Sequence, residues 1–284
     1  MIVPGVAAMP GREPDDAQRP AAAAVFFLLV FAFSVPFYLI GMTGWRLPGL
    51  PMLPLSALMG FVPMVVAMVL VARSGRGSAV LQLLPRLLDP ISWKGVRWLV
   101  LAVIFMPVVC LIEYGVLAQR GVALPAVRLE TTNILFLLAA FVVGAVGEEM
   151  GWQGYAYPAL RRSHTVLGAA LIIGVVWAIW HILPFAQLGR GGRWIMWHSL
   201  SAVALRMIIV WFFEASRQRM LIAVVFHAMI NLSWAVFPAE GSAYDPFIAF
   251  IILAPTATVA ALVGTPGNRR RAVADGFDSR TGDP

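Results

Sequence analysis

Residues 134–162 read ILFLLAAFVVGAVGEEMGWQGYAYPALRR, and this stretch decides both the fold and the place of the chemistry. It is a long apolar run with two acids, Glu148 and Glu149, side by side inside it. An ionised carboxylate in hydrocarbon is costly unless it is paired, hydrogen-bonded, protonated or wet, and a neighbouring acid raises that cost. Acids within a membrane segment therefore mark a functional site, and we expect other segments to supply groups that accept these two.

The whole chain is much more apolar than a soluble domain. Of its 284 residues, 60% are hydrophobic and 12% are charged, whereas soluble domains carry about 25% charged residues. This composition predicts an all-α fold, a polytopic transmembrane helical bundle of about eight spans. The two acids inside it are the reason to expect a catalytic cavity within the membrane. The net charge of +7 does not form a basic stripe, so we expect membrane lipids and no nucleic acid as acidic partners.

Eight apolar segments have about the 17 to 25 residues that a bilayer core requires, except that the fourth is longer. They cover residues 21–42, 55–72, 98–117, 134–162, 166–183, 195–215, 220–237 and 246–263. We therefore predict a transmembrane domain at 21–265, between a disordered polar N-terminal tail at 1–20 and a polar C-terminal tail at 266–284.

The basic residues predict the orientation of these helices. Of the 21 Lys and Arg, fifteen lie on the side of the two termini, five lie on the other side, and Arg206 lies inside a span. Because basic loops stay in the cytoplasm, we predict an integral, multi-pass protein of the membrane (the cell membrane in a bacterium) with both termini cytoplasmic. Residues 78–88 are expected to form an interfacial helix or a solvated linker.

Counting the helical rise places five polar residues in one layer of the bilayer. At about 1.5 Å per residue from the cytoplasmic ends of their helices, Glu148 lies about 20 Å deep and His181 about 24 Å deep. On the same count His227 and Asn231 lie about 12 and 18 Å deep, on one face of their helix. Together with Glu149, they are the candidate catalytic residues.

Residues beside this layer have predicted supporting parts. Gly147 and Gly151 form a small-xxx-small pair that permits close approach of another helix, although plain packing explains it equally well. Trp152, Trp177 and Trp180 flank the layer and are candidates to line a substrate cavity.

Taken singly, each polar residue also has an ordinary explanation. His181, His227 and Asn231 are each typical of interhelical hydrogen bonding. Glu113 and Glu214 lie near predicted helix ends, where we expect water. The combination of two Glu, two His and one Asn at one depth nevertheless favours a functional site.

Three motifs carry this combination within residues 144–234. They are Glu148-Glu149 with a Gly-Trp-x-Gly surround, the aromatic-x-x-x-His from Trp177 to His181, and the His-x-x-x-Asn from His227 to Asn231. In content and order they resemble the motifs of the CPBP intramembrane proteases, the family that contains the CAAX prenyl endopeptidases.

The resemblance implies a helical-bundle peptidase in which Glu148, helped by His181, activates water. It also implies that His227 and Asn231 hold the oxyanion and that Glu149 belongs to the site. The implied substrate is the C-terminal part of a lipid-modified, CAAX-like or otherwise membrane-tethered peptide or protein.

The first motif departs from the family pattern, which normally reads Glu-Glu-x-x-x-Arg, because this chain has Gln153 at the Arg position. Gln153 can hydrogen-bond Glu149 four residues earlier but brings no positive charge. Arg206, about 13 Å deep, is a substitute. We hypothesise that Arg206 reaches Glu148 or Glu149. The alternative is that its long side chain extends along the helix so that the guanidinium lies among the lipid headgroups.

The residue types suit peptide hydrolysis, which needs a base for water, donors for the oxyanion and an acid for the leaving amine. The favoured reading is a metal-free glutamic endopeptidase without a cofactor. The alternative is a metallopeptidase with Zn²⁺ on Glu148, His181 and His227, because carboxylate and imidazole are zinc ligands.

Two readings without peptide hydrolysis remain. One is an inactive protease homologue that acts as a membrane scaffold or as an immunity or protection protein, which the Gln153 departure favours. The other is a small-solute transporter, but the first half of the chain has no polar counterpart to suggest an inverted repeat.

Overall fold

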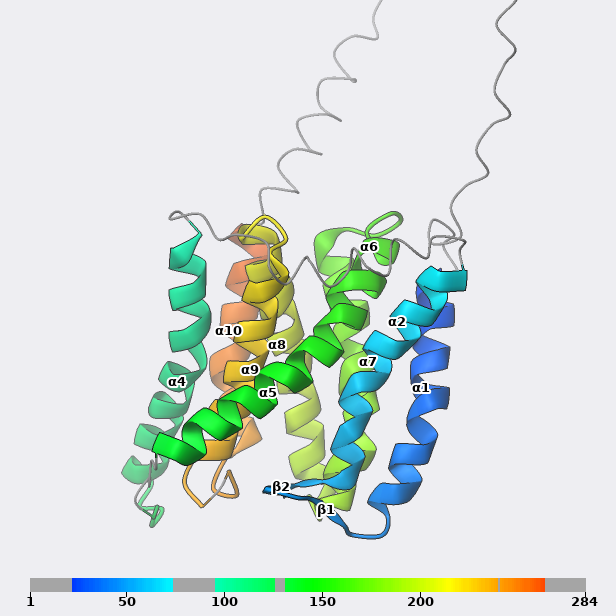
Figure 1. Cartoon of the computed structure of the whole chain (residues 1–284). Helices are drawn as coiled ribbons and strands as arrows, with labels where there is room; N and C mark the ends of the chain where they lie inside the picture. The colour runs from blue at the N-terminus through cyan, green and yellow to red at the C-terminus, as the bar shows by residue number, and fades with distance from the viewer. Residues whose placement is uncertain (1–21, 74–94, 126–130, 240, 264–284) are drawn as a thin grey trace, which may run out of the picture.

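The computed structural model describes residues 22–73, 95–125, 131–239 and 241–263, which form a bundle of long helices (Figure 1). The elements are α1 (Ala22–Gly41), strands β1 (Arg46–Leu47) and β2 (Leu50–Pro54), the 3₁₀ helix η2 (Leu55–Phe61), α2 (Val62–Arg73), α4 (Val96–Gln119), α5 (Thr131–Gly151), the π-helical turn η4 (Trp152–Ala156), α6 (Tyr157–Leu160), α7 (Val166–Gln187), α8 (Gly192–Ala215), α9 (Met220–Val236) and α10 (Pro246–Val263). The predicted helical fold class is confirmed.

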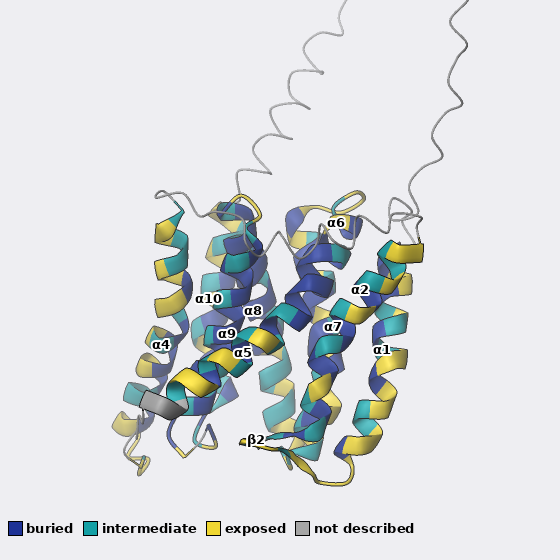
Figure 2. Ribbon diagram, viewed as in Figure 1, coloured by how far each residue is buried: buried dark blue, intermediate teal, exposed yellow. Residues whose placement is uncertain are grey.

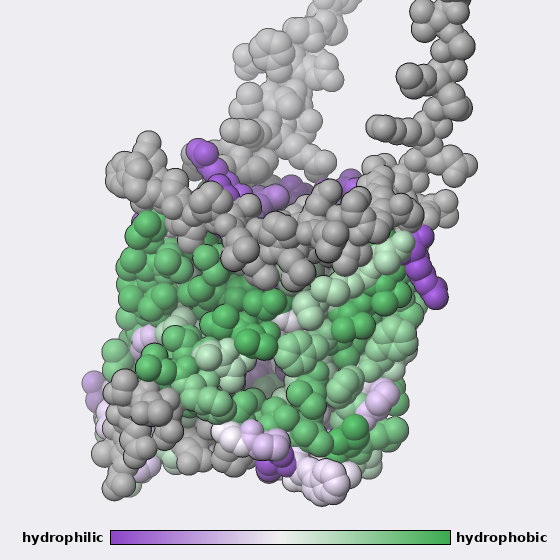
Figure 3. Space-filling model, viewed as in Figure 1, coloured by the Kyte–Doolittle hydropathy of each residue, from purple (hydrophilic) through white to green (hydrophobic). Residues whose placement is uncertain are grey.

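The protein is an integral, multi-pass membrane protein. In the described part of the chain, 7 helical segments are long and apolar enough to cross a bilayer, and α9 is a shorter apolar helix. The side chains of the bundle form a broad apolar surface (Figure 3). The seventh predicted span, at 220–237, is thus the one that falls short in length. It packs against α4, α5 and α8 in the interior of the bundle.

The two ends of the bundle domain lie on the same side, since α1 begins and α10 ends at the top of Figure 1. This arrangement agrees with the predicted alternation of the helices. Which side is cytoplasmic stays a prediction. The tails at 1–20 and 266–284 and the segment at 78–88 lie outside the described residues.

The connector between the first two membrane helices contains a small hairpin that the sequence did not indicate. Strands β1 and β2 pair in antiparallel fashion, with Leu47 opposite Leu50. Gly49 lies in the left-handed region at φ +77°, a conformation that glycine adopts without steric cost.

Helix α5 determines where the site forms. It crosses the bundle obliquely and packs on α2 and α9 (Figure 1), and its exposed beginning leads to a buried end (Figure 2). A Cβ on Gly147 would lie 2.8 Å from the backbone oxygen of Gly60, and one on Gly151 would overlap Pro63. The close approach predicted for these two glycines is therefore confirmed, and it holds η2 and α2 against the acid-bearing turn.

Candidate active site

The two acids end α5, one turn before the backbone widens into the π-helical turn η4. Glu148 is 8% exposed and Glu149 is fully buried. Tyr157 donates its backbone N–H to the carbonyl of Trp152, the five-residue spacing of a π helix. Such turns are frequent at functional sites. The acids thus lie inside the bundle, facing α7, α8 and α9.

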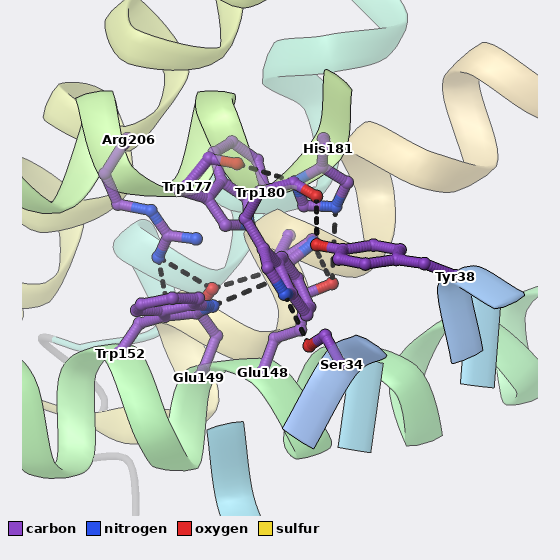
Figure 4. A network of polar contacts seen from close by, with 10 residues as sticks. Ser34, Tyr38, Glu148, Glu149, Trp152, Trp177, Trp180, His181 and Arg206 are labelled. Carbon is purple, nitrogen blue, oxygen red and sulfur yellow. Dashed lines mark hydrogen bonds and ion pairs between the residues drawn. The ribbon is translucent and has the colours of Figure 1, made fainter. Parts of the chain in front are cut away.

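Glu149 is paired with Arg206 of α8. The Nη1 atom of Arg206 lies 2.8 Å from Oε1 and 2.9 Å from Oε2 of Glu149, and both side chains are fully buried (Figure 4). The guanidinium also lies over the ring of Trp177, with Cζ 4.3 Å from the ring centroid. The hypothesis that Arg206 reaches one of the acids is therefore confirmed, and the headgroup alternative is wrong because no part of Arg206 is exposed.

Glu149 in turn orients His227 of α9. The Nδ1 atom of His227 lies 2.7 Å from Oε1 of Glu149. A carboxylate paired with arginine only accepts hydrogen bonds, so we assign the proton to Nδ1. The other ring nitrogen, Nε2, then faces Glu148, 3.9 Å from its Oε1. This is the arrangement by which a carboxylate fixes the tautomer and direction of an imidazole.

Glu148 is held by two indoles. Its Oε2 accepts hydrogen bonds from Nε1 of Trp177 at 2.6 Å and from Nε1 of Trp152 at 3.3 Å. Hydrogen bonds to one oxygen fix the carboxylate plane and leave Oε1 turned toward the imidazoles. The conformation of Glu148 is thus set by η4 and α7 together.

His181 of α7 completes the group around this oxygen. Its Nδ1 lies 2.8 Å from the carbonyl of Trp177, which can only accept, so Nδ1 carries the proton. Its Nε2 lies 4.0 Å from Oε1 of Glu148, and its side chain is 21% exposed. Two imidazoles therefore direct Nε2 at one carboxylate oxygen, and His181 is the more accessible of the two.

Comparison with known proteins matches the part of the chain that contains these residues. A model of the family described as Type II CAAX prenyl endopeptidase Rce1-like matches residues 130–233. The chain is 24% identical to CAAX prenyl protease 2 of Methanococcus maripaludis over 185 residues, which cover 60% of this chain and 68% of that protein. The chain is similar to the Rce1-like CAAX prenyl endopeptidases. The family resemblance predicted from the three motifs is thus confirmed, and the matched region contains all three.

The structure brings four of the five predicted catalytic residues into contact or near contact, and Asn231 makes no polar contact with them. Asn231 is partly exposed, one turn beyond His227 on α9. It makes no hydrogen bond within the described part of the chain. Its part in catalysis stays a prediction.

Gln153 does not support Glu149 as expected. It is fully buried, and within the described residues neither atom of its amide has a hydrogen-bond partner. Gln153 lies in the π-helical turn, where the register departs from the four-residue spacing on which the expectation rested. The charge partner of Glu149 therefore comes from another helix.

The predicted cavity lining by tryptophan is wrong for Trp152 and Trp180, because neither has any exposed surface. Their rings pack at 5.7 Å between centroids. Nε1 of Trp180 donates to Ser34 of α1 at 2.8 Å, and the Tyr38 hydroxyl donates to the carbonyl of Trp180 (Figure 4). Trp177 is 5% exposed and donates to Glu148. Trp152 and Trp180 therefore hold the site together, and the part of Trp177 in lining a cavity stays a prediction.

Sequence reasoning missed these indole donors, although one signal was present. Trp152 follows Glu148 by four residues and Trp177 precedes His181 by four, which puts each pair on one helix face. Ser34 and Tyr38 of α1 are also four residues apart, but the apolar run around them contains no charged residue that would have marked them as part of a site.

Glu113 and Glu214 are not in water as expected. Glu113 is fully buried, and its Oε1 accepts the backbone N–H of Asp245 at 2.6 Å, which ties α4 to the start of α10. Glu214 is 6% exposed and accepts hydrogen bonds from Tyr157 and Gln218. Both acids fasten helix ends away from the site.

The donor set Glu148, His181 and His227 has the chemistry that zinc prefers. Among the described residues, however, no group of three or more His, Cys, Asp or Glu has the spacing of a metal site. We therefore derive no step through a metal, and the zinc reading stays a separate hypothesis.

Proposed function

We propose that the protein is an intramembrane endopeptidase in which Glu148 activates water to hydrolyse a peptide bond of a membrane-associated substrate. One observation carries the proposal: Nε2 of His181 and Nε2 of His227 lie 4.0 and 3.9 Å from the same oxygen of Glu148. These separations exceed a direct hydrogen bond, and a water that makes contacts of about 2.8 Å fits between such atoms.

In the first step, Glu148 takes one proton from this water while the water oxygen attacks the carbonyl carbon. The carbonyl oxygen becomes an oxyanion. When the carbon–nitrogen bond breaks, the proton held by Glu148 passes to the leaving amine, and the products are a carboxylic acid and an amine. The indole donors suit this exchange, because they hold Oε2 and leave Oε1 to the water.

The summed charge of the buried acids and Arg206 indicates which group donates a hydrogen bond to the oxyanion. Glu148 and Glu149 together carry two negative charges and Arg206 one positive charge, so one further proton makes the group neutral, as a membrane interior favours. We place this proton on Nε2 of His227, whose Nδ1 already donates to Glu149. His227 can then donate to the oxyanion, with the amide of Asn231 as the second donor.

The relative's name suggests the class of substrate. The relative is named as a CAAX prenyl protease, and the proposed catalytic residues of this chain belong to a bundle of apolar helices. We propose a CAAX-like, lipid-modified or otherwise membrane-tethered substrate.

The test uses the full chain in lipid vesicles with a library of membrane-tethered peptides, prenylated and unprenylated. Wild type should cleave a subset of them, and Glu148→Gln should abolish cleavage while it leaves the unfolding transition in place. Glu214→Gln is the matched control, because it changes an equally buried acid that contacts Tyr157 and lies outside the site. Cleavage by Glu148→Gln at the wild-type rate would refute the mechanism. A wild type that cleaves no peptide would favour the scaffold reading.

A further inference from the structure

The cation that neutralises Glu149 comes from an unexpected helix. Gln153, on the acid-bearing chain segment, brings no charge and has an amide without a partner in the described residues. Arg206 reaches Glu149 from α8, 57 residues further along the chain. The pair therefore joins two helices that the sequence keeps far apart.

The packing of α7 on α8 makes this reach feasible. A Cβ on Gly174 of α7 would lie 3.3 Å from Cβ of Arg206 and 3.3 Å from Cα of Val203. The glycine thus leaves room for the stem of Arg206 beside α7. The guanidinium then lies over Trp177 of the same helix, with Cζ 4.3 Å from the ring centroid.

Arg206 has no route to a substrate, because it is fully buried. Its Nη1 donates a hydrogen bond to Glu149. Its Nε and Nη2 atoms are buried without a hydrogen-bond partner in the described part of the chain. Any effect on catalysis must pass through its neighbours. The contact that leads to the reacting atoms is Glu149 Oε1, which receives both Nη1 of Arg206 and Nδ1 of His227.

We propose that Arg206 is a positioning residue, which keeps Glu149 ionised so that Glu149 fixes the ring of His227 with Nδ1 protonated and Nε2 facing Glu148. This inference rests on the proposed function for its kinetic consequence and on geometry for the state of His227. A further consequence is that the positive charge is what matters. An arginine at position 153, whose side chain is longer than the glutamine that does not reach Glu149 there, should therefore replace the one on α8.

The kinetic test compares Arg206→Gln, Arg206→Lys and the double variant Gln153→Arg/Arg206→Gln in vesicles. Hydrogen-bond partners that orient a metal-binding histidine are worth about 10 to 100-fold in activity, and we take the same scale for the partner that orients His227. We expect kcat to fall about that much in Arg206→Gln with KM nearly unchanged, to fall less in Arg206→Lys, and to recover about tenfold in the double variant. An unchanged kcat, or a rise in KM alone, would overturn the positioning role. A double variant no faster than Arg206→Gln would overturn the equivalence of the two charge positions.

A spectroscopic test does not depend on cleavage. In protein labelled with ¹⁵N-histidine, the two ring nitrogens of His227, assigned by comparison with His227→Gln, should show a protonated Nδ1 in wild type. Arg206→Gln should shift the His227 signals, and Glu214→Gln should leave them in place. Identical His227 signals in wild type and Arg206→Gln would overturn the inference even if no substrate is found. If Arg206→Gln does not fold, Arg206→Lys and the double variant supply both readouts.

Discussion

Removal of one partner of the Glu149–Arg206 pair should destabilise the protein far more than removal of both. The atoms lie 2.8 Å apart with no exposure on either side. At an effective dielectric constant of about 20, two unit charges at this separation attract by about 6 kcal/mol. Much of that attraction offsets the cost of taking the charges out of water. Breaking such a pair leaves one buried charge uncompensated, so Arg206→Met and Glu149→Gln should each cost about 3 to 5 kcal/mol.

The double variant Glu149→Gln/Arg206→Met should cost clearly less than either single variant, because neither charge is then left alone. The free energies of unfolding are measured by reversible denaturation in mixed micelles of lipid and detergent. The pair Tyr157 and Glu214, which hydrogen-bonds at 2.8 Å through a neutral hydroxyl, provides the control cycle with a smaller coupling. Additive single effects, with a coupling below about 0.5 kcal/mol, would refute the argument that the two charges depend on each other.

Two further predictions concern the reacting carboxylate. Trp177→Phe removes the indole nitrogen that donates to Oε2 of Glu148 at 2.6 Å but keeps an aromatic ring under Arg206. Because a hydrogen bond to a charged group is worth about 1.5 to 3 kcal/mol, kcat/KM should fall about tenfold or more. Trp98→Phe on α4 is the control, and wild-type activity of Trp177→Phe would contradict the assigned role. If the route is metal-free, metal analysis of the purified protein should find no stoichiometric zinc, and a chelator should leave the cleavage rate unchanged. One zinc per chain, with loss of activity on chelation, would establish the metal alternative.

The helices were predictable because a bilayer imposes a minimum apolar length. The span predicted at 166–183 corresponds to α7 at Val166–Gln187, and the last predicted span has the bounds of α10. The β1–β2 hairpin was not predictable, because two residues of pairing leave no periodic pattern in the sequence.

The site was predictable in its members but not in its contacts. Counting helical rise brought Glu148, His181 and His227 to one depth, and the structure places both Nε2 atoms within 4.0 Å of one carboxylate oxygen. The depth of a residue in the bilayer does not indicate in which direction its side chain points around the helix axis. For this reason the tryptophans expected at a cavity are buried donors and packing residues, and Gln153, expected beside Glu149, has no partner within the described residues.

The sequence by itself determined that two acids lie inside a membrane bundle and that these acids need a positive charge, since hydrocarbon does not solvate them. It also showed that the usual arginine is absent from position 153. Only the tertiary structure decided that Arg206 supplies the charge and that Glu149, not Glu148, receives it. The choice depends on how closely α7 and α8 approach at Gly174 and on where α5 widens at Trp152, and both are set by packing between segments distant in the chain.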